Sequence, residues 1–117
     1  MLRVSTSGYN YSHNHCIDIV EWFVDEYLSR YKLDINIHHR RLVKRDGVLG
    51  WAWVSGSERR PREFEIEIHN LMDREDYTKT LLHELWHVYQ HVKKIVLCET
   101  EAYEMEEVLF KNYNKGS

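Results

Sequence analysis

Three histidines recur at intervals of four in the segment TLLHELWHVYQH, residues 80–91. His83, Glu84 and His87 form an H-E-x-x-H motif. On a helix, residues i and i+4 lie one turn apart on the same face, so two imidazoles can bind one zinc ion. Glu84 is one step round the helix, where its carboxylate can take a proton from a water bound to the metal. The motif predicts His83 and His87 as ligands of one Zn²⁺ per chain, with Glu84 as the general base.

A catalytic zinc site uses three protein ligands and keeps one open position. His91 is the nearest candidate for the third ligand. On a continuous helix it lies about 12 Å along the axis from His83 and about 80° round it. Ligand bonds to zinc are only about 2 Å long. We therefore expect His91 to face the rim of the site or to pack against the next helix.

The acidic segment after this helix offers better candidates for the third ligand. A tight antiparallel return of the chain near Lys94 would place residue 101 opposite residue 87. Glu99 is the neighbouring alternative, and two of the later glutamates would require a later turn. The glutamates of this segment are Glu99, Glu101, Glu104, Glu106 and Glu107.

The remaining sequence predicts a small α+β domain that comprises residues 1–117. Apolar residues at helical spacing predict helices in the acidic segment and near the N-terminus, where Asn14 is a plausible N-cap. Asp73 is the expected N-cap of the histidine helix, with Asp76 three residues on. Residues 1–14 are polar and are expected to be irregular. The expected order is α-β-β-β-α-α: helix 16–31, strand 33–43, turn 45–47, strand 48–55, strand 63–70, helix 73–94 and helix 98–113.

Composition restricts the class of protein. The chain has 117 residues and a formal net charge of −3, so nothing global indicates nucleic acid as a partner. No apolar run could span a bilayer, and the N-terminus lacks the apolar centre of a secretory signal. Cys16 and Cys98 form no C-x-x-C pair, which is typical of a reducing compartment. We expect a cytoplasmic protein without a membrane partner.

HELWH followed by ETEAYEME resembles the gluzincins, zinc peptidases whose third ligand is a glutamate on a second helix. The chain is similar to the single-domain minigluzincins, and REFEIEIHN…TLLHELWHVYQ…ETEAYEME resembles small metallopeptidase-like proteins of bacteriophage genomes. The resemblance implies a zincin-like fold, a peptide or protein substrate, and the host cytoplasm if a phage encodes the chain. In thermolysin-like members the glutamate ligand precedes an alanine, which implies Glu101, before Ala102, as the third ligand.

The chain departs from that pattern at Met105, where thermolysin-like enzymes have an aspartate that hydrogen-bonds a ligand histidine. Glu104 or His69 would have to replace it. The oxyanion donor of the larger enzymes also lies beyond the glutamate helix. Candidates for this donor are Tyr103, Tyr89, His91, His13 and His15.

The resemblance also implies a role for strand 63–70, EFEIEIHN. In such enzymes the strand beside the site lies at the sheet edge and pairs with an extended substrate. The polar face of this strand carries Glu63, Glu65 and Glu67. If that face borders the cleft, Glu65 and Glu67 bind substrate and basic peptides are favoured. The alternative is a solvated sheet face.

Three other interpretations stay open. The chain could be a zinc-binding interaction protein with little turnover. The basic runs at 38–45 and 58–62 could indicate a SprT-like protease that acts near nucleic acid, since such proteases share the H-E-x-x-H motif. The third interpretation is a second metal site at HNHC, residues 13–16, although the spacing of these residues fits no common zinc motif.

Overall fold

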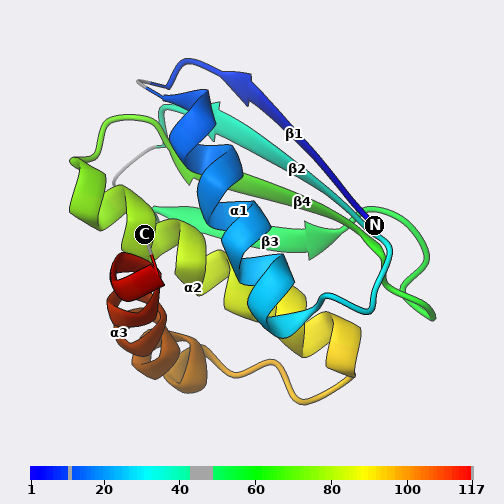
Figure 1. The fold of residues 1–117 in the computed structure, drawn as a ribbon. Helices are drawn as coiled ribbons and strands as arrows, with labels where there is room; N and C mark the ends of the chain where they lie inside the picture. The colour runs from blue at the N-terminus through cyan, green and yellow to red at the C-terminus, as the bar shows by residue number, and fades with distance from the viewer. Residues whose placement is uncertain (11, 43–48, 117) are drawn as a thin grey trace.

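The computed structural model describes residues 1–10, 12–42 and 49–116. These residues form three helices and a four-stranded sheet, so the α+β class is confirmed (Figure 1). The expected turn at 45–47 lies outside the described residues. The elements in chain order are β1 Leu2–Gly8, α1 His13–Tyr27, β2 Leu33–Arg40, β3 Gly50–Val54, β4 Glu63–His69, α2 Arg74–Lys93 and α3 Glu99–Gly116.

The predicted order of elements lacked strand β1, because the N-terminal segment that we expected to be irregular forms this strand. β1 pairs in parallel with β2, in a register that places Leu2 opposite Leu33 and Val4 opposite Ile35. Only two apolar residues alternate in β1, so its periodicity is weak in the sequence. Helix α1 also begins earlier than predicted. Its N-cap is Ser12, not Asn14, and the Ser12 side chain accepts a hydrogen bond from the His15 amide at 3.1 Å.

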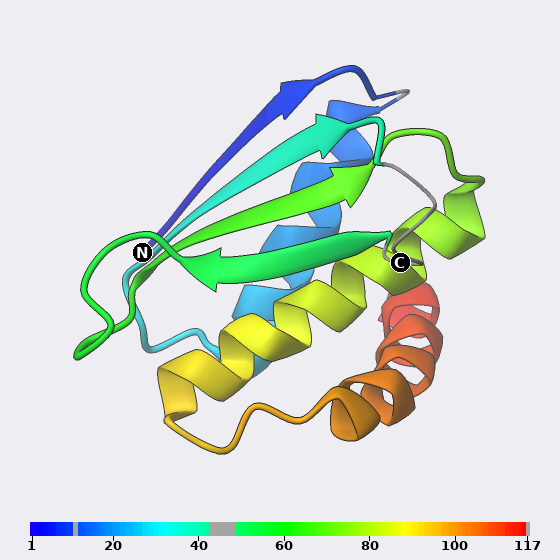
Figure 2. The same ribbon diagram turned by 180° about the vertical axis from the view of Figure 1, so that it is seen from behind.

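The mixed sheet has the order β1-β2-β4-β3. β4 pairs in parallel with β2 on one side and antiparallel with β3 on the other. The expectation that strand 63–70 forms the sheet edge is therefore wrong. The edge nearest to α2 is β3, which packs against that helix. Figure 2 shows the face of the sheet that lies opposite to α1 and α2.

Helices α1 and α2 lie on the opposite face of the sheet and bury the core. The core joins their apolar residues to Ile35, Ile37, Phe64, Ile66 and Ile68, which are all fully buried. α3 packs beside α2, and the Tyr113 hydroxyl at its far end donates to Asp18 of α1 at 2.5 Å. In the described part of the chain, no helix combines the length and the apolar character needed to cross a bilayer.

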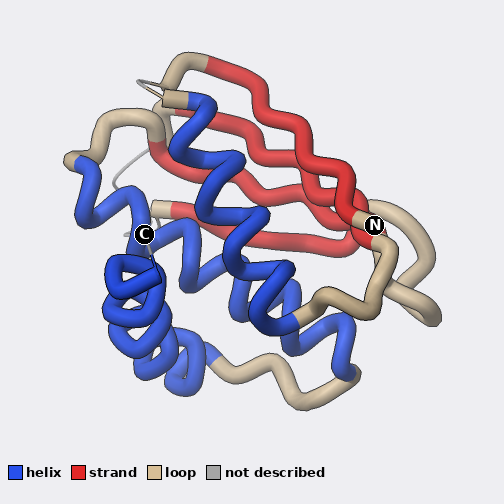
Figure 3. The backbone as a smooth tube through the Cα atoms, in the orientation of Figure 1, coloured by secondary structure: helices blue, strands red, loops and turns tan. Residues whose placement is uncertain are grey.

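The ends of α2 determine where the candidate site lies. Asp73 is the N-cap, as predicted, and accepts a hydrogen bond from the Asp76 amide at 2.9 Å. At the other end Lys94 takes a left-handed backbone conformation, with φ of 55°, and stops the helix. The short loop 95–98, seen between the two helices in Figure 3, then returns the chain so that α3 starts beside α2.

Candidate metal centre

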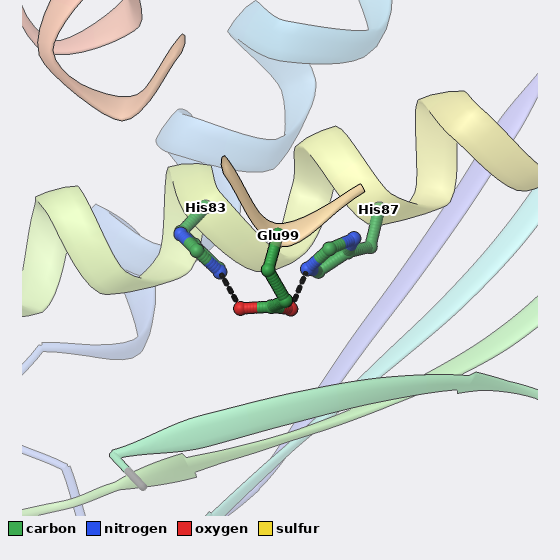
Figure 4. Close-up of side chains that lie close together, drawn as sticks. All are labelled: His83, His87 and Glu99. Atoms are coloured by element: carbon green, nitrogen blue, oxygen red, sulfur yellow. Dashed lines mark ion pairs between the residues drawn. The ribbon is translucent and has the colours of Figure 1, made fainter. Parts of the chain in front are cut away.

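Two histidines of α2 and one glutamate of α3 converge. His83 and His87 lie one turn apart on α2, and Glu99 is the first residue of α3. One Glu99 oxygen lies 3.3 Å from Nε2 of His83, and the other lies 2.5 Å from Nε2 of His87 (Figure 4). A set of ligand atoms, one from each residue, lies within 4.8 Å of one another. Among the described residues, this is the one group with such an arrangement.

The donor set could hold a metal ion, and zinc is one ion that takes such ligands. Two ligand atoms bound about 2.0–2.1 Å from a tetrahedral ion would lie about 3.3 Å apart. The His83–Glu99 distance of 3.3 Å matches this separation, whereas the His87–Glu99 distance of 2.5 Å is shorter. Nε2 of His87 is buried and has no hydrogen-bond partner among the described residues, although a Glu99 oxygen is near. A buried nitrogen with an unused lone pair, aimed at a carboxylate, is suited to a cation between them.

The other ring nitrogen of each histidine has an acceptor. His83 donates from Nδ1 to Glu106 at 2.9 Å, and His87 donates from Nδ1 to the Gln90 side-chain oxygen at 2.8 Å. Since both acceptors take the Nδ1 proton, both Nε2 atoms keep a lone pair for a metal.

The partner expected for a ligand histidine was Glu104 or His69, and the structure places neither of them there. Glu104 is exposed on α3. His69 accepts a hydrogen bond from the Leu42 amide at 3.1 Å. Glu106 and Gln90 take this role instead. Gln90 was missed because glutamine is not a metal ligand, although its position three residues after His87 places it on the adjoining turn.

Glu84 lies beside the cluster and is almost fully buried. Burial, and then the charges of Glu99 and Glu106, raise the pKa of its carboxyl to about 8. A divalent cation beside the three carboxyl groups would lower this pKa, so that Glu84 is ionised at neutral pH when a metal is bound. Gly50 of β3 covers Glu84, because a Cβ at residue 50 would lie 3.5 Å from Cγ of Glu84.

A cavity of about 720 Å³ exposes the cluster and Glu84 between β3 and the two helices. His91 lines it but does not belong to the cluster, as expected of a residue at the rim. Three large apolar residues that line it are partly exposed: Leu49, Leu97 and Tyr103. Trp51 is paired with Glu67, so its side chain lies on the other face of the sheet.

Glu101, the ligand implied by the resemblance, does not reach the histidines. Its Oε1 accepts hydrogen bonds from Nε1 of Trp86 at 2.7 Å and from Nε2 of Gln90 at 3.2 Å. These hydrogen bonds, in that order, lower the pKa of the Glu101 carboxyl. The structure therefore gives Glu99, the alternative left open by the spacing, the position beside the histidines.

Glu65 and Glu67, expected to bind substrate, are also not at the centre. Because Phe64, Ile66 and Ile68 point into the core, the glutamates between them lie on the other face of the sheet. Glu65 accepts hydrogen bonds from Asn36 at 2.9 Å and His38 at 2.8 Å. Burial raises the pKa of Glu65, but these bonds and one from Ser55 outweigh it and lower the pKa. Glu67 forms an ion pair with Arg40 at 2.9 Å.

The residues of the segment 13–16 form no second group of metal-binding side chains in the described part of the chain. His13 contacts Thr6, and His15 contacts the Thr78 hydroxyl at 3.0 Å. Cys16 is fully buried, and burial raises the pKa of its thiol to about 11.

Comparisons with protein-family models, with curated proteins and with solved structures give no match. The functional assignment therefore depends on the geometry of the site and on the resemblance of its motifs.

Proposed function

We propose that this chain is a zinc-dependent peptidase of the gluzincin type, with His83, His87 and Glu99 as the metal ligands. The observation that carries the proposal is the convergence of two Nε2 atoms and one carboxylate beside a buried glutamate in an open cavity. Two nitrogens and one carboxylate are a ligand set of catalytic zinc sites. When bound, zinc would supply a Lewis acid that polarises a water molecule and the scissile carbonyl.

The protein groups then have separate tasks. Glu84 accepts the proton of the attacking water on its carboxylate and passes it to the leaving amine. Glu106 and Gln90 hold the two imidazoles by their Nδ1 protons. Gly50 of β3 packs against the stem of Glu84, so little of this side chain is exposed, and a weakly hydrated carboxylate interacts more strongly with the reacting groups.

The cavity edges support a different substrate preference from the one that the acidic strand suggested. Glu65 and Glu67 already pair with β2 and lie on the face away from the helices. The cavity is lined instead by the partly exposed Leu49, Leu97 and Tyr103. We therefore propose peptides with large apolar side chains, rather than basic peptides, as the preferred substrates.

The experiment is peptide-library cleavage by the zinc-loaded protein and by Glu84→Gln. The glutamine has the size of glutamate but cannot accept the proton, so we expect cleavage to fall to background while zinc content is unchanged. Cleavage that survives in Glu84→Gln would contradict the assignment of the base. Tight zinc binding without cleavage in the wild type would favour a zinc-binding protein that does not turn over.

A further inference from the structure

Gln90 is a completely buried amide between the histidine helix and the start of α3. Its oxygen accepts hydrogen bonds from His87 Nδ1 at 2.8 Å and from the Cys98 amide at 3.4 Å. Its nitrogen donates to the Cys98 carbonyl and to Glu101, both at 3.2 Å. A buried amide that is hydrogen-bonded through both its oxygen and its nitrogen has a fixed position, because turning it would leave buried polar groups unpaired.

Cys98 and Glu101 together determine which way round this amide lies, because the Cys98 amide can only donate and its carbonyl can only accept. An ionised carboxylate can only accept hydrogen bonds, so the Gln90 nitrogen must face Glu101 and the Gln90 oxygen must face His87. Nε1 of Trp86 donates to the same Glu101 oxygen at 2.7 Å and holds it in place. The lowered pKa of Glu101 agrees with a carboxylate that stays ionised.

The hydrogen bonds with Cys98 link the same amide to the third ligand. Cys98 immediately precedes Glu99, and Gln90 binds both its amide and its carbonyl. One side chain therefore orients the His87 ring and also fixes the backbone from which the Glu99 carboxylate projects.

We propose that Gln90, oriented by Cys98 and Glu101, is a positioning residue that fixes the Nδ1-protonated form of His87 and the place of Glu99. The part of this inference that concerns metal affinity rests on the proposed metal site, whereas the part that concerns the protonation of His87 does not. Glu101 thus acts on the site through Gln90, without contact with the metal.

The first test is the tautomer of His87 in the metal-free protein, read from the ¹⁵N chemical shifts of its ring. We expect the Nδ1–H tautomer in the wild type and in Glu101→Gln, since an amide oxygen at residue 101 still accepts from Gln90. We expect a mixture of tautomers in Gln90→Met, which keeps the length of the side chain but removes the amide. A single Nδ1–H tautomer in Gln90→Met would overturn the proposal.

The second test is zinc affinity, measured by competition with a chelator. We expect Gln90→Met to weaken zinc binding by about 10- to 100-fold, the usual effect of removing a partner of a ligand histidine. We expect Glu101→Ala to weaken it less, because Cys98 still holds the amide. Glu104→Ala, an exposed glutamate on the same helix, is the control and should bind as the wild type does. Wild-type affinity in Gln90→Met would overturn the proposal.

The experiments distinguish a failure of the proposed function from a failure of the proposal about Gln90. If the wild type binds no zinc, the proposed function fails, while the tautomer of His87 still decides whether Gln90 positions the ring. If Gln90→Met does not fold, the tautomer in Gln90→Asn decides the question, because that variant keeps an amide but shortens the side chain that reaches His87. A mixture of tautomers in it supports the proposal, and the wild-type tautomer contradicts it.

Discussion

Glu99 and Glu101 have the same chemistry, yet only one of them can face the histidines. Residues two positions apart on a helix differ by about 200° in direction, so the side chains of Glu99 and Glu101 leave nearly opposite faces of α3. Glu99 shares its face with Tyr103 and Glu106, four and seven residues further on. All three line the cavity, whereas Glu101 points to Trp86 and Gln90.

The same face of α3 favours one donor for the developing oxyanion. Of the expected candidates, only Tyr103 and His91 line the cavity among the described residues. The Tyr103 ring lies 4.6 Å from the His83 ring and the residue is 62% exposed, so a substrate can reach its hydroxyl. The His91 ring packs near Phe64.

We therefore predict that Tyr103→Phe lowers kcat by about 100-fold, the scale of losing one oxyanion donor. Zinc content should not change, because Tyr103 is outside the ligand set. His91→Gln, the matched change on the other side of the cavity, should have a much smaller effect on kcat. Steady-state kinetics of both variants on one peptide would measure the two values of kcat. A larger loss of kcat in His91→Gln than in Tyr103→Phe would refute Tyr103 as the oxyanion donor.

At the scale of elements, the site depends on the close approach of β3 to α2. A Cβ at Gly50 would meet the Glu67 carbonyl oxygen at 3.0 Å and the Thr80 methyl at 3.4 Å. Since backbone of β4 cannot easily give way, we predict that Gly50→Ala lowers the free energy of unfolding by about 1 kcal/mol. Urea denaturation would measure this difference.

Gly56→Ala is the control for that prediction. A Cβ at Gly56 would meet the carboxyl end of the flexible Glu63 side chain, which can rotate away, and the Glu63 Cβ at 3.2 Å, but no backbone atom of another strand. We expect Gly56→Ala to lower the free energy of unfolding by less than Gly50→Ala does. Equal stability of the two variants would show that β3 does not pack against α2 as closely as described.

Local patterns in the sequence predicted the elements with strong periodicity and the residues within one helix. The pair His83 and His87, the N-cap Asp73 and strands 33–43 and 63–70 all follow from spacing along one element. The position of strand 63–70 inside the sheet could not be predicted in this way, because a strand shows the same apolar–polar alternation at the edge of a sheet as in its middle. Glu99 could not be separated from Glu101, since the left-handed turn at Lys94 and the loop 95–98 determine which face of α3 meets the histidines.

At the scale of the whole molecule, buried histidines make stability depend on pH. His39 is buried between β2 and α2, where it donates from Nδ1 to the Ser7 carbonyl and accepts from the Tyr77 hydroxyl. Burial, together with the neighbouring His13 and His38, lowers its pKa despite the hydrogen bond to Ser7. The unfolded chain therefore takes up a proton on His39 at a higher pH than the folded chain does.

We predict that this contribution to stability is complete above the ordinary histidine pKa of about 6.5 and is lost as pH falls through the lower, folded value. Urea unfolding with EDTA present, at several values of pH from about 7.5 to 5, would show it. His39→Gln can keep both hydrogen bonds but cannot titrate, so its stability should fall less steeply with acid. The same slope in both proteins would contradict the prediction.

The most direct test of the proposed metal centre is the zinc content of the purified wild type, Glu99→Gln and Glu101→Gln after reconstitution and dialysis. The two variants make the same chemical change two residues apart on α3. We predict about one zinc per chain in the wild type and in Glu101→Gln, and loss of zinc in Glu99→Gln. Absence of zinc from the wild type, or zinc kept by Glu99→Gln and lost by Glu101→Gln, would contradict the assignment of His83, His87 and Glu99 as the ligands.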